Sequence, residues 1–228
     1  MSGRISTGVA VLDKLLDGGY ESDTVTTVYG PSGSGKTNVC MLVAVSVARS
    51  GKRVIYIDTE GGFSVDRLRQ IAPDDYDKII GNITFLVPTS FDEQKKSFDK
   101  LPSAIDDSVG LVVVDTIAML YRLEMGKSDR VYSVNKDLGL QISYLNEITR
   151  KKNIAVLITN QVYSNFEDNT VKMVGGDILK YGSKCLIALD TFREGIRSAT
   201  VKKHRSIPES RSILFKIINS GLEEVDSP

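Results

Sequence analysis

The chain has 228 residues, 29 of them basic and 29 acidic, so its formal net charge at pH 7 is zero. A dedicated nucleic-acid-binding domain is usually clearly basic, so any contact with DNA must depend on a local patch of charge. The length suits a single domain over residues 1–228 rather than two. No apolar run approaches the roughly 20 residues of a membrane span, and no secretory signal is recognisable, so we expect a cytoplasmic protein without a membrane partner.

Apolar runs alternate with helical patterns along most of the chain. The predicted strands lie at residues 24–29, 53–58, 83–87, 110–115 and 154–159, and the predicted helices at 38–49, 64–71, 92–101 and 131–152. Continuously apolar strands separated by helices indicate a parallel sheet covered on both faces. Three strand-like runs at 185–192, 196–203 and 211–219 follow with short turns between them and should pair antiparallel. The expected fold class is α/β: a mostly parallel central sheet flanked by helices, with antiparallel strands at the C-terminal edge.

Residues 30–37 fit the P-loop pattern G-x-x-x-x-G-K-[ST] at every fixed position, between a predicted strand and a predicted helix. The glycines let backbone N–H groups turn inward around a phosphate at the N-terminus of the helix. Lys36 is expected to reach the β- and γ-phosphates, and the hydroxyl of Thr37 to hold Mg²⁺. The residues predicted to bind the nucleoside triphosphate are Gly30, Pro31, Ser32, Gly33, Ser34, Gly35, Lys36 and Thr37.

Three polar residues end neighbouring apolar strands, and strand ends of an open α/β sheet converge on the ligand crevice. Asp115 fits a carboxylate that holds the metal's water shell, although a turn-initiating Asp is the ordinary alternative. Glu60 is placed to polarise a water for attack on the γ-phosphate, or is a solvated loop residue. Gln161 can hydrogen-bond the γ-phosphate or the attacking water, or is simply a polar strand end.

Taken in order, these pieces resemble the RecA/RadA recombinase superfamily over essentially the whole chain. The segments that carry the resemblance are 6–8, 12–13, 16–19, 30–37, 57–63, 111–115, 118–122, 158–162 and 175–176. The resemblance implies a single RecA-like ATPase core with ATP and Mg²⁺ as cofactors. It implies Glu60 as the catalytic water activator and Gln161 as the γ-phosphate sensor. It also implies that Arg67 packs on the adenine ring, where an exposed helix arginine is the alternative.

Two departures narrow the resemblance. No helix-hairpin-helix domain with a polymerisation linker precedes the core, and the segment between Gln161 and Gly175 is short for a strand-exchange loop. The chain looks most like an archaeal paralogue of the main recombinase. That implies a DNA-binding accessory protein of homologous recombination and DNA repair, with weak ATPase activity and no strand exchange of its own. It further implies cooperation with the main recombinase RadA and a Holliday junction resolvase, and leaves a homodimer open.

In this superfamily two loops face DNA, here 123–130 and 162–174. The first region carries Arg122, Lys127 and Arg130, whereas acidic residues dilute the charge of the second. The densest basic cluster is the run of Lys202, Lys203, His204 and Arg205. We predict that these residues bind single-stranded or branched DNA; contact with a neighbouring subunit's nucleotide and a merely solvated turn are the alternatives for the run.

A competing interpretation is a regulatory ATPase similar to KaiC, which shares the opening motifs and would act on protein partners instead of DNA. The segment 59–63 and the basic run favour the recombination role. ATP hydrolysis in this superfamily often needs a neighbouring subunit to complete the site. Without a polymerisation linker, we therefore expect slow turnover that DNA stimulates little.

Overall fold

The computed structural model of the protein describes residues 3–127, 131–165 and 170–226. Within these residues the strands are β1 (Arg4–Ile5), β2 (Tyr20–Glu21), β3 (Val25–Gly30), β4 (Arg53–Asp58), β5 (Ile83–Leu86), β6 (Val109–Asp115), β7 (Ala155–Asn165), β8 (Thr170–Met173), β9 (Cys185–Thr191), β10 (Ile196–Lys203), β11 (Ser212–Ile218) and β12 (Gly221–Val225). The helices are α1 (Ala10–Leu15), α2 (Lys36–Arg49), α3 (Val65–Ile71), α4 (Tyr76–Gly81), α5 (Phe91–Ala104), α6 (Met119–Met125), α7 (Val131–Lys152) and α8 (Gly176–Gly182).

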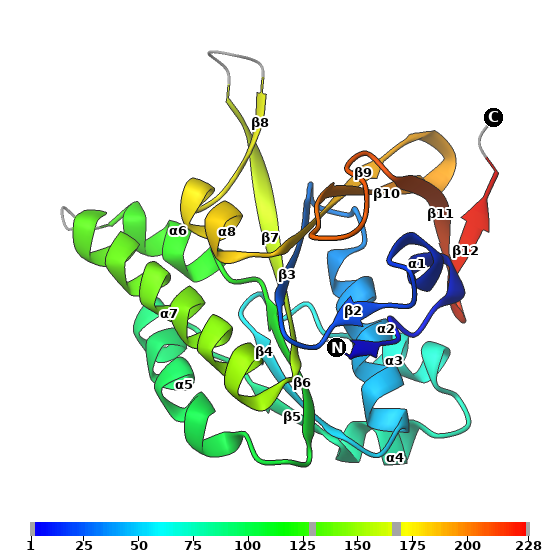
Figure 1. Ribbon diagram of the computed structural model, residues 1–228, viewed down its shortest axis with the longest axis horizontal. Coiled ribbons are helices and arrows are strands. Elements are labelled where there is room, and N and C mark those ends of the chain that lie inside the picture. The colour runs from blue at the N-terminus through cyan, green and yellow to red at the C-terminus, as the bar shows by residue number, and fades with distance from the viewer. Residues whose placement is uncertain (1–2, 128–130, 166–169, 227–228) are drawn as a thin grey trace.

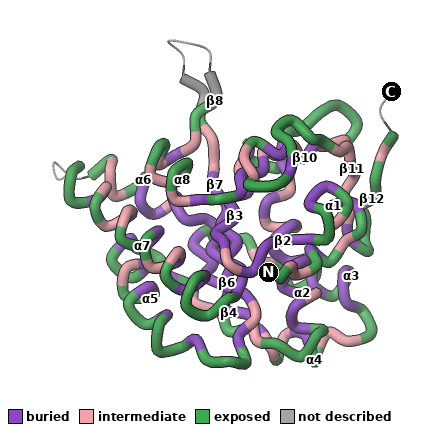
Figure 2. Tube along the Cα trace, in the orientation of Figure 1, coloured by how far each residue is buried: buried purple, intermediate pink, exposed green. Residues whose placement is uncertain are grey.

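The main sheet has the strand order β12-β11-β10-β9-β3-β7-β6-β4-β5, with β8 paired to β7. The strands from β9 to β5 in this order run parallel, whereas β10, β11 and β12 pair antiparallel at the other side. The predicted fold class is therefore confirmed. The central strands are buried on both faces (Figure 2), which is why they appear in the sequence as continuous apolar runs rather than as alternating ones.

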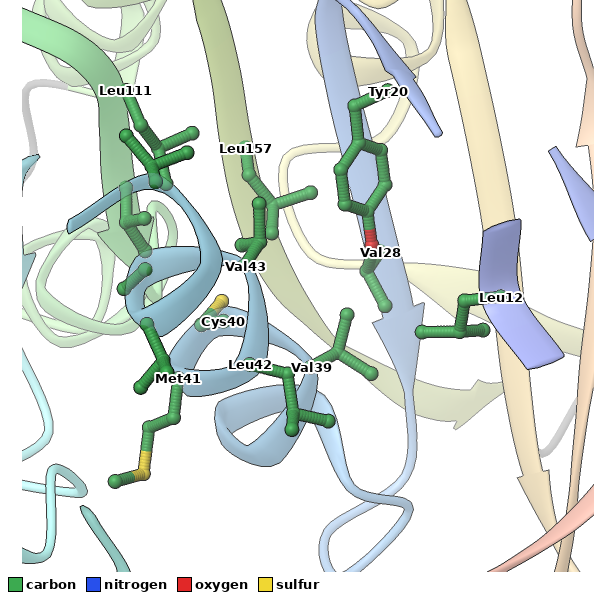
Figure 3. Close-up of a cluster of buried hydrophobic side chains, with 14 of the residues drawn as sticks. Leu12, Tyr20, Val28, Val39, Cys40, Met41, Leu42, Val43, Leu111 and Leu157 are labelled. Atoms are coloured by element: carbon green, nitrogen blue, oxygen red, sulfur yellow. The ribbon is translucent and has the colours of Figure 1, made fainter. Parts of the chain in front are cut away.

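Two helical layers cover the sheet. The helices α1 to α4 pack on one face and α5 to α8 on the other (Figure 1), and each face has its own apolar cluster. On the first face, α2 presents residues such as Val39 and Val43 in the cluster that includes Val28 of β3, Leu111 of β6 and Leu157 of β7 (Figure 3). Burying each large side chain of this kind contributes about 1.5–3 kcal/mol, so α2 is held firmly against the strands that carry the predicted site.

The predicted C-terminal end of the long helix agrees with the structure. The helix α7 spans Val131–Lys152, and Asn153 follows it with a left-handed φ of 52°. Asparagine tolerates that conformation better than most residues do. The apolar residues at three- and four-residue steps, from Val134 to Ile148, are buried against the second face of the sheet.

The second predicted DNA loop differs from the expectation. Instead of an irregular segment over 162–174, β7 continues past Gln161 to Asn165 and pairs antiparallel with β8. This hairpin projects beyond the carboxyl edge of the sheet (Figure 1). Both arms contain β-branched and aromatic residues, including Val162 opposite Met173 and Tyr163 opposite Lys172, which suit a pleated strand.

Candidate nucleotide-binding site

The predicted P-loop turns from the end of β3 directly into α2. Gly30 closes β3, and a Cβ there would lie 2.3 Å from the carbonyl oxygen of Leu189 on β9, so no side chain fits. Gly35 precedes α2 with a left-handed φ of 101°, which glycine adopts without strain. The loop therefore ends on the N-terminus of a 14-residue helix, where unpaired backbone N–H groups attract an anion.

The ammonium of Lys36 lies inside this loop. It donates hydrogen bonds to the carbonyl oxygens of Gly30 at 3.0 Å and Pro31 at 2.8 Å. Burial lowers the pKa of Lys36, against the opposing attraction of the carboxylates of Glu60 and Asp115. A partly desolvated cation that is held by neutral carbonyls gains strongly from an anionic neighbour. The arrangement suits a phosphate group.

Asp115, at the carboxyl end of β6, is 2% exposed. Its carboxylate accepts hydrogen bonds from the hydroxyls of Tyr56, at 3.0 Å, and Thr159, from the strands on either side. Burial raises the pKa of Asp115, while hydrogen bonds from Thr159, Thr37 and Tyr56 oppose that rise. The carboxylate and the Thr37 hydroxyl are thus brought together, as the sequence predicts.

These two oxygen groups fit Mg²⁺. Magnesium prefers oxygen ligands and is usually bound by one or two protein groups, with waters and substrate phosphates completing its shell. Among the residues that the structure describes, no cluster of three or more His, Cys, Asp or Glu side chains is suited to hold a metal. A magnesium ion here would therefore depend on the phosphates of the nucleotide, with Thr37 as its direct ligand and Asp115 acting through water.

A residue that the sequence analysis did not single out organises the neighbouring loop. Asp58, at the end of β4, is 4% exposed, and its Oδ1 accepts backbone N–H bonds from Glu60, Gly61 and Gly62 at 2.8–3.2 Å. Its Oδ2 accepts the N–H of Phe63 at 3.0 Å. One carboxylate therefore fixes four consecutive residues, and with them the position of Glu60.

The structure brings Glu60 and Gln161 together, as predicted. Glu60 Oε1 accepts a hydrogen bond from Gln161 Nε2 at 2.7 Å and another from Thr116 Oγ1 at 2.9 Å. Gln161 belongs to β7 and pairs in register with Gly30 of β3, so the pair lies beside the P-loop. A carboxylate with one oxygen held by two donors keeps its other oxygen for a water or a ligand.

A pocket of about 350 Å³ unites these groups. Its lining residues are Ser32, Gly33, Gly35, Lys36, Thr37, Asn38, Glu60, Asp115, Gln161, Arg197 and Ile217. Asn38, Arg197 and Ile217 were not predicted as site residues. Arg197 of β10 donates its Nε–H to the carbonyl oxygen of Gly33 at 3.1 Å. The C-terminal antiparallel strands therefore form one wall of the pocket, a placement that no local motif reveals.

Arg67 lies at the edge of this region. Its Nε donates to Asn38 Oδ1 at 2.7 Å, and its other nitrogens donate to the carbonyl oxygens of Ile218 and Asn219 at 2.8 and 2.9 Å. Burial lowers the pKa of Arg67. The guanidinium thus joins α3 to the start of α2 and to the turn between β11 and β12. Stacking of Arg67 on adenine stays a prediction.

The residues predicted to contact DNA differ in how far they are already bonded within the fold. Arg205 pairs with Asp23 at 2.6 Å and with Glu21 at 2.8 Å. The ring of His204 is 2% exposed and accepts the backbone N–H groups of Ser206 and Ile207. Arg205 and His204 are therefore both engaged within the fold.

Of the other two residues of the run, Lys203 is also engaged with the described residues and Lys202 is not. Lys203 donates to the carbonyl oxygens of Lys180 and Ser183 at 2.9 and 2.7 Å, whereas Lys202 is exposed. Arg122 and Lys127, on and just after α6, are also exposed. Arg130 lies outside the described residues. DNA contact by these residues stays a prediction.

Comparison with known proteins identifies the family. The Rad51 family model matches residues 3–225. The chain belongs to the Rad51 family. It is 46% identical over 218 residues to the DNA repair and recombination protein RadB of Methanobrevibacter smithii, covering 92% of each chain. It is 40% identical over 217 residues to RadB of Methanococcus maripaludis, covering 95% of this chain and 98% of that protein.

A solved structure extends the match to three dimensions. The crystal structure of the RadB recombinase superposes with a TM-score of 0.83 at 36% identity, over 97% of this chain and all of that one (100%). The resemblance to an archaeal recombinase paralogue is therefore confirmed. The predicted RecA-like fold agrees with this Rad51-family architecture. Among the described residues, none of the helices has the length and apolar character needed to cross a bilayer.

Proposed function

We propose that this member of the Rad51 family binds ATP with Mg²⁺, binds single-stranded or branched DNA, and serves as an accessory protein in homologous recombination and repair. The observation that carries the ATP site is the convergence of Lys36, Thr37, Asp115, Glu60 and Gln161 on one pocket. The family match supports this role over that of a KaiC-like regulator, because the relatives named above are DNA repair and recombination proteins.

Each residue has a distinct role in the proposal. The P-loop amides and Lys36 hold the phosphates, and Thr37 and Asp115 hold Mg²⁺, which when bound neutralises charge on the β- and γ-phosphates. Glu60 orients and polarises the attacking water. Gln161 Nε2 donates one of its two N–H groups to Glu60 Oε1 at 2.7 Å, which leaves the second N–H to donate to a γ-phosphate. Binding of a triphosphate would therefore change the hydrogen bonds of Gln161 at the base of the β7–β8 hairpin.

We expect ATP turnover to be slow and little stimulated by DNA. Lys36 and Arg197 are the cations that line the pocket in the part of the chain that the structure describes. Stabilising the transition state of phosphoryl transfer usually needs a further positive group, often from a neighbouring subunit. We propose that the protein does not itself carry out strand exchange and that it cooperates with the recombinase RadA and with a Holliday junction resolvase. A homodimer is one assembly that would supply the further positive group.

A salt-dependent titration of labelled single-stranded DNA tests the DNA part of the proposal. Binding should weaken as salt rises, because each neutralised phosphate of a single strand contributes about 0.7 to the slope of log affinity against log salt. The same titration with and without ATP and Mg²⁺ reports whether the nucleotide affects DNA binding. Absence of DNA binding at low salt would remove the recombination role and favour a protein-directed ATPase.

A further inference from the structure

A groove between α7 and α8 combines an exposed aromatic ring with cations that make no ion pair within the described residues. The groove has a volume of about 350 Å³ and includes Arg150, Tyr181 and Lys184 in its lining. Tyr181 is 72% exposed, whereas an aromatic ring of that size usually stabilises a protein by being buried. The two helices lie side by side on the face of the sheet away from α2 (Figure 1).

The walls of the groove are fixed by the fold. Asn146 of α7 donates to the carbonyl oxygen of Gly182 at 2.9 Å. A Cβ on Gly182 would lie 2.2 Å from a methyl carbon of Ile142, so the close approach of α8 to α7 requires glycine at this position. Tyr181 and Lys184 therefore extend from a rigid base, and the entropic cost of ordering them around a ligand is low.

Three lysines gather at the C-terminal end of α8. Lys203 donates to the carbonyl oxygens of Lys180 and Ser183, and the nearby charges of Lys184 and Lys180 add to burial in lowering the pKa of Lys203. Lys203 thus satisfies the end of the helix, as lysines near helix C-termini often do. Neither Lys180 nor Lys184 makes an ion pair within the described residues.

The adjacent basic turn differs from this cluster, because the arginine of that turn is paired with acidic residues. Glu21 and Asp23 neutralise Arg205, and Glu147 of α7 pairs with Lys151 rather than with Arg150. Of the remaining cations, Arg150 and Lys184 line the groove together with the exposed Tyr181, and Lys180 precedes Tyr181 on α8. Cations that follow a phosphate backbone, with an aromatic ring on which a base can stack, are the usual elements of a single-strand binding surface.

We propose that the groove between α7 and α8 binds single-stranded nucleic acid, with a base stacked on Tyr181 and phosphates on Arg150, Lys180 and Lys184. This surface is separate from the two loops that follow β6 and β7. It adds a contact surface to the DNA binding proposed above and rests on that binding. Binding at this surface does not depend on base sequence, because every base offers a face for stacking.

The test is fluorescence anisotropy with a labelled oligothymidylate at several salt concentrations. The double variant Lys180→Glu with Lys184→Glu should bind more weakly, and its salt slope should fall by about 1.4, the value for two phosphates of a single strand. Tyr181→Ala should weaken binding by roughly 5- to 150-fold, the equivalent of losing one stacked base. Tyr181→Phe retains the ring and should bind like the wild type.

A matched control separates local contact from the overall field. Lys96→Glu with Lys100→Glu, on the exposed face of α5, changes the net charge equally and should leave affinity nearly unchanged. Circular dichroism of every variant checks the fold. If the wild type binds and the groove variants equal the control, the groove proposal is wrong while DNA binding stands; if the wild type itself does not bind, both fail. Loss of self-association in the groove variants with unchanged DNA affinity would also overturn the proposal, in favour of contact with a second copy.

Discussion

Replacing Asp58 by asparagine tests how the loop that carries Glu60 is held. The carboxylate accepts four backbone N–H groups, three on Oδ1 and one on Oδ2. In Asp58→Asn the amide oxygen can still accept three of these bonds, but the amide nitrogen would then face the N–H of Phe63. A buried donor left without an acceptor costs about 1–3 kcal/mol. The substitution also removes the repulsion between Asp58 and the nearby Asp115, whose pKa the charge of Asp58 helps to raise. This gain offsets a smaller part of that cost.

We therefore expect Asp58→Asn to lower the free energy of unfolding by about 1–3 kcal/mol and to reduce ATP turnover more than ATP affinity. Urea denaturation and a steady-state ATPase assay measure the two effects. Asp66→Asn is a matched control, since its side chain is 89% exposed and should change neither quantity. Wild-type stability together with wild-type turnover in Asp58→Asn would refute the role given to this carboxylate.

Three further predictions concern single side chains. Asp115→Asn should raise the urea midpoint at neutral pH, because burial raises the pKa of Asp115 and its ionised form therefore costs stability at that pH. The same variant should lose Mg²⁺-dependent ATPase activity. A urea midpoint lower than that of the wild type would contradict this account. Glu60→Gln should leave ATP affinity nearly unchanged and lose hydrolysis in a single-turnover assay, because the amide cannot act as a general base. Retained hydrolysis would exclude Glu60 as water activator. Arg205→Ala should destabilise the fold by about 1 kcal/mol in urea denaturation, because it leaves the nearly buried Glu21 without its closest cation; unchanged stability would show that the ion pair contributes nothing.

The sequence predicts the sheet and the P-loop well, for local physical reasons. The strand around Val113 is continuously apolar because both of its faces are buried, and the spacing from Gly30 to Thr37 is set by the geometry of a phosphate cradle. Glu60, Asp115 and Gln161 could be placed at the same edge because parallel strands end together. These inferences need only the order of elements along the chain.

The features that the sequence did not predict depend on distant contacts. Arg197 reaches Gly33 only because β10 lies beside β9, which in turn pairs with β3. Likewise, the basic turn is partly neutralised by Glu21 and Asp23, which are far from Arg205 in the sequence. Local composition reports the charges of a segment, but not the partners that the tertiary fold brings to it.

Isothermal titration calorimetry of ATP in the presence of Mg²⁺, on the wild type and on Lys36→Ala, tests the central claim most directly. Lys36 is the buried cation of the loop and donates to the carbonyl oxygens of Gly30 and Pro31. We predict that the wild type binds ATP in a Mg²⁺-dependent manner and that Lys36→Ala loses this binding while its circular dichroism spectrum is unchanged. Equal ATP affinity in the two proteins would contradict the assignment of the site.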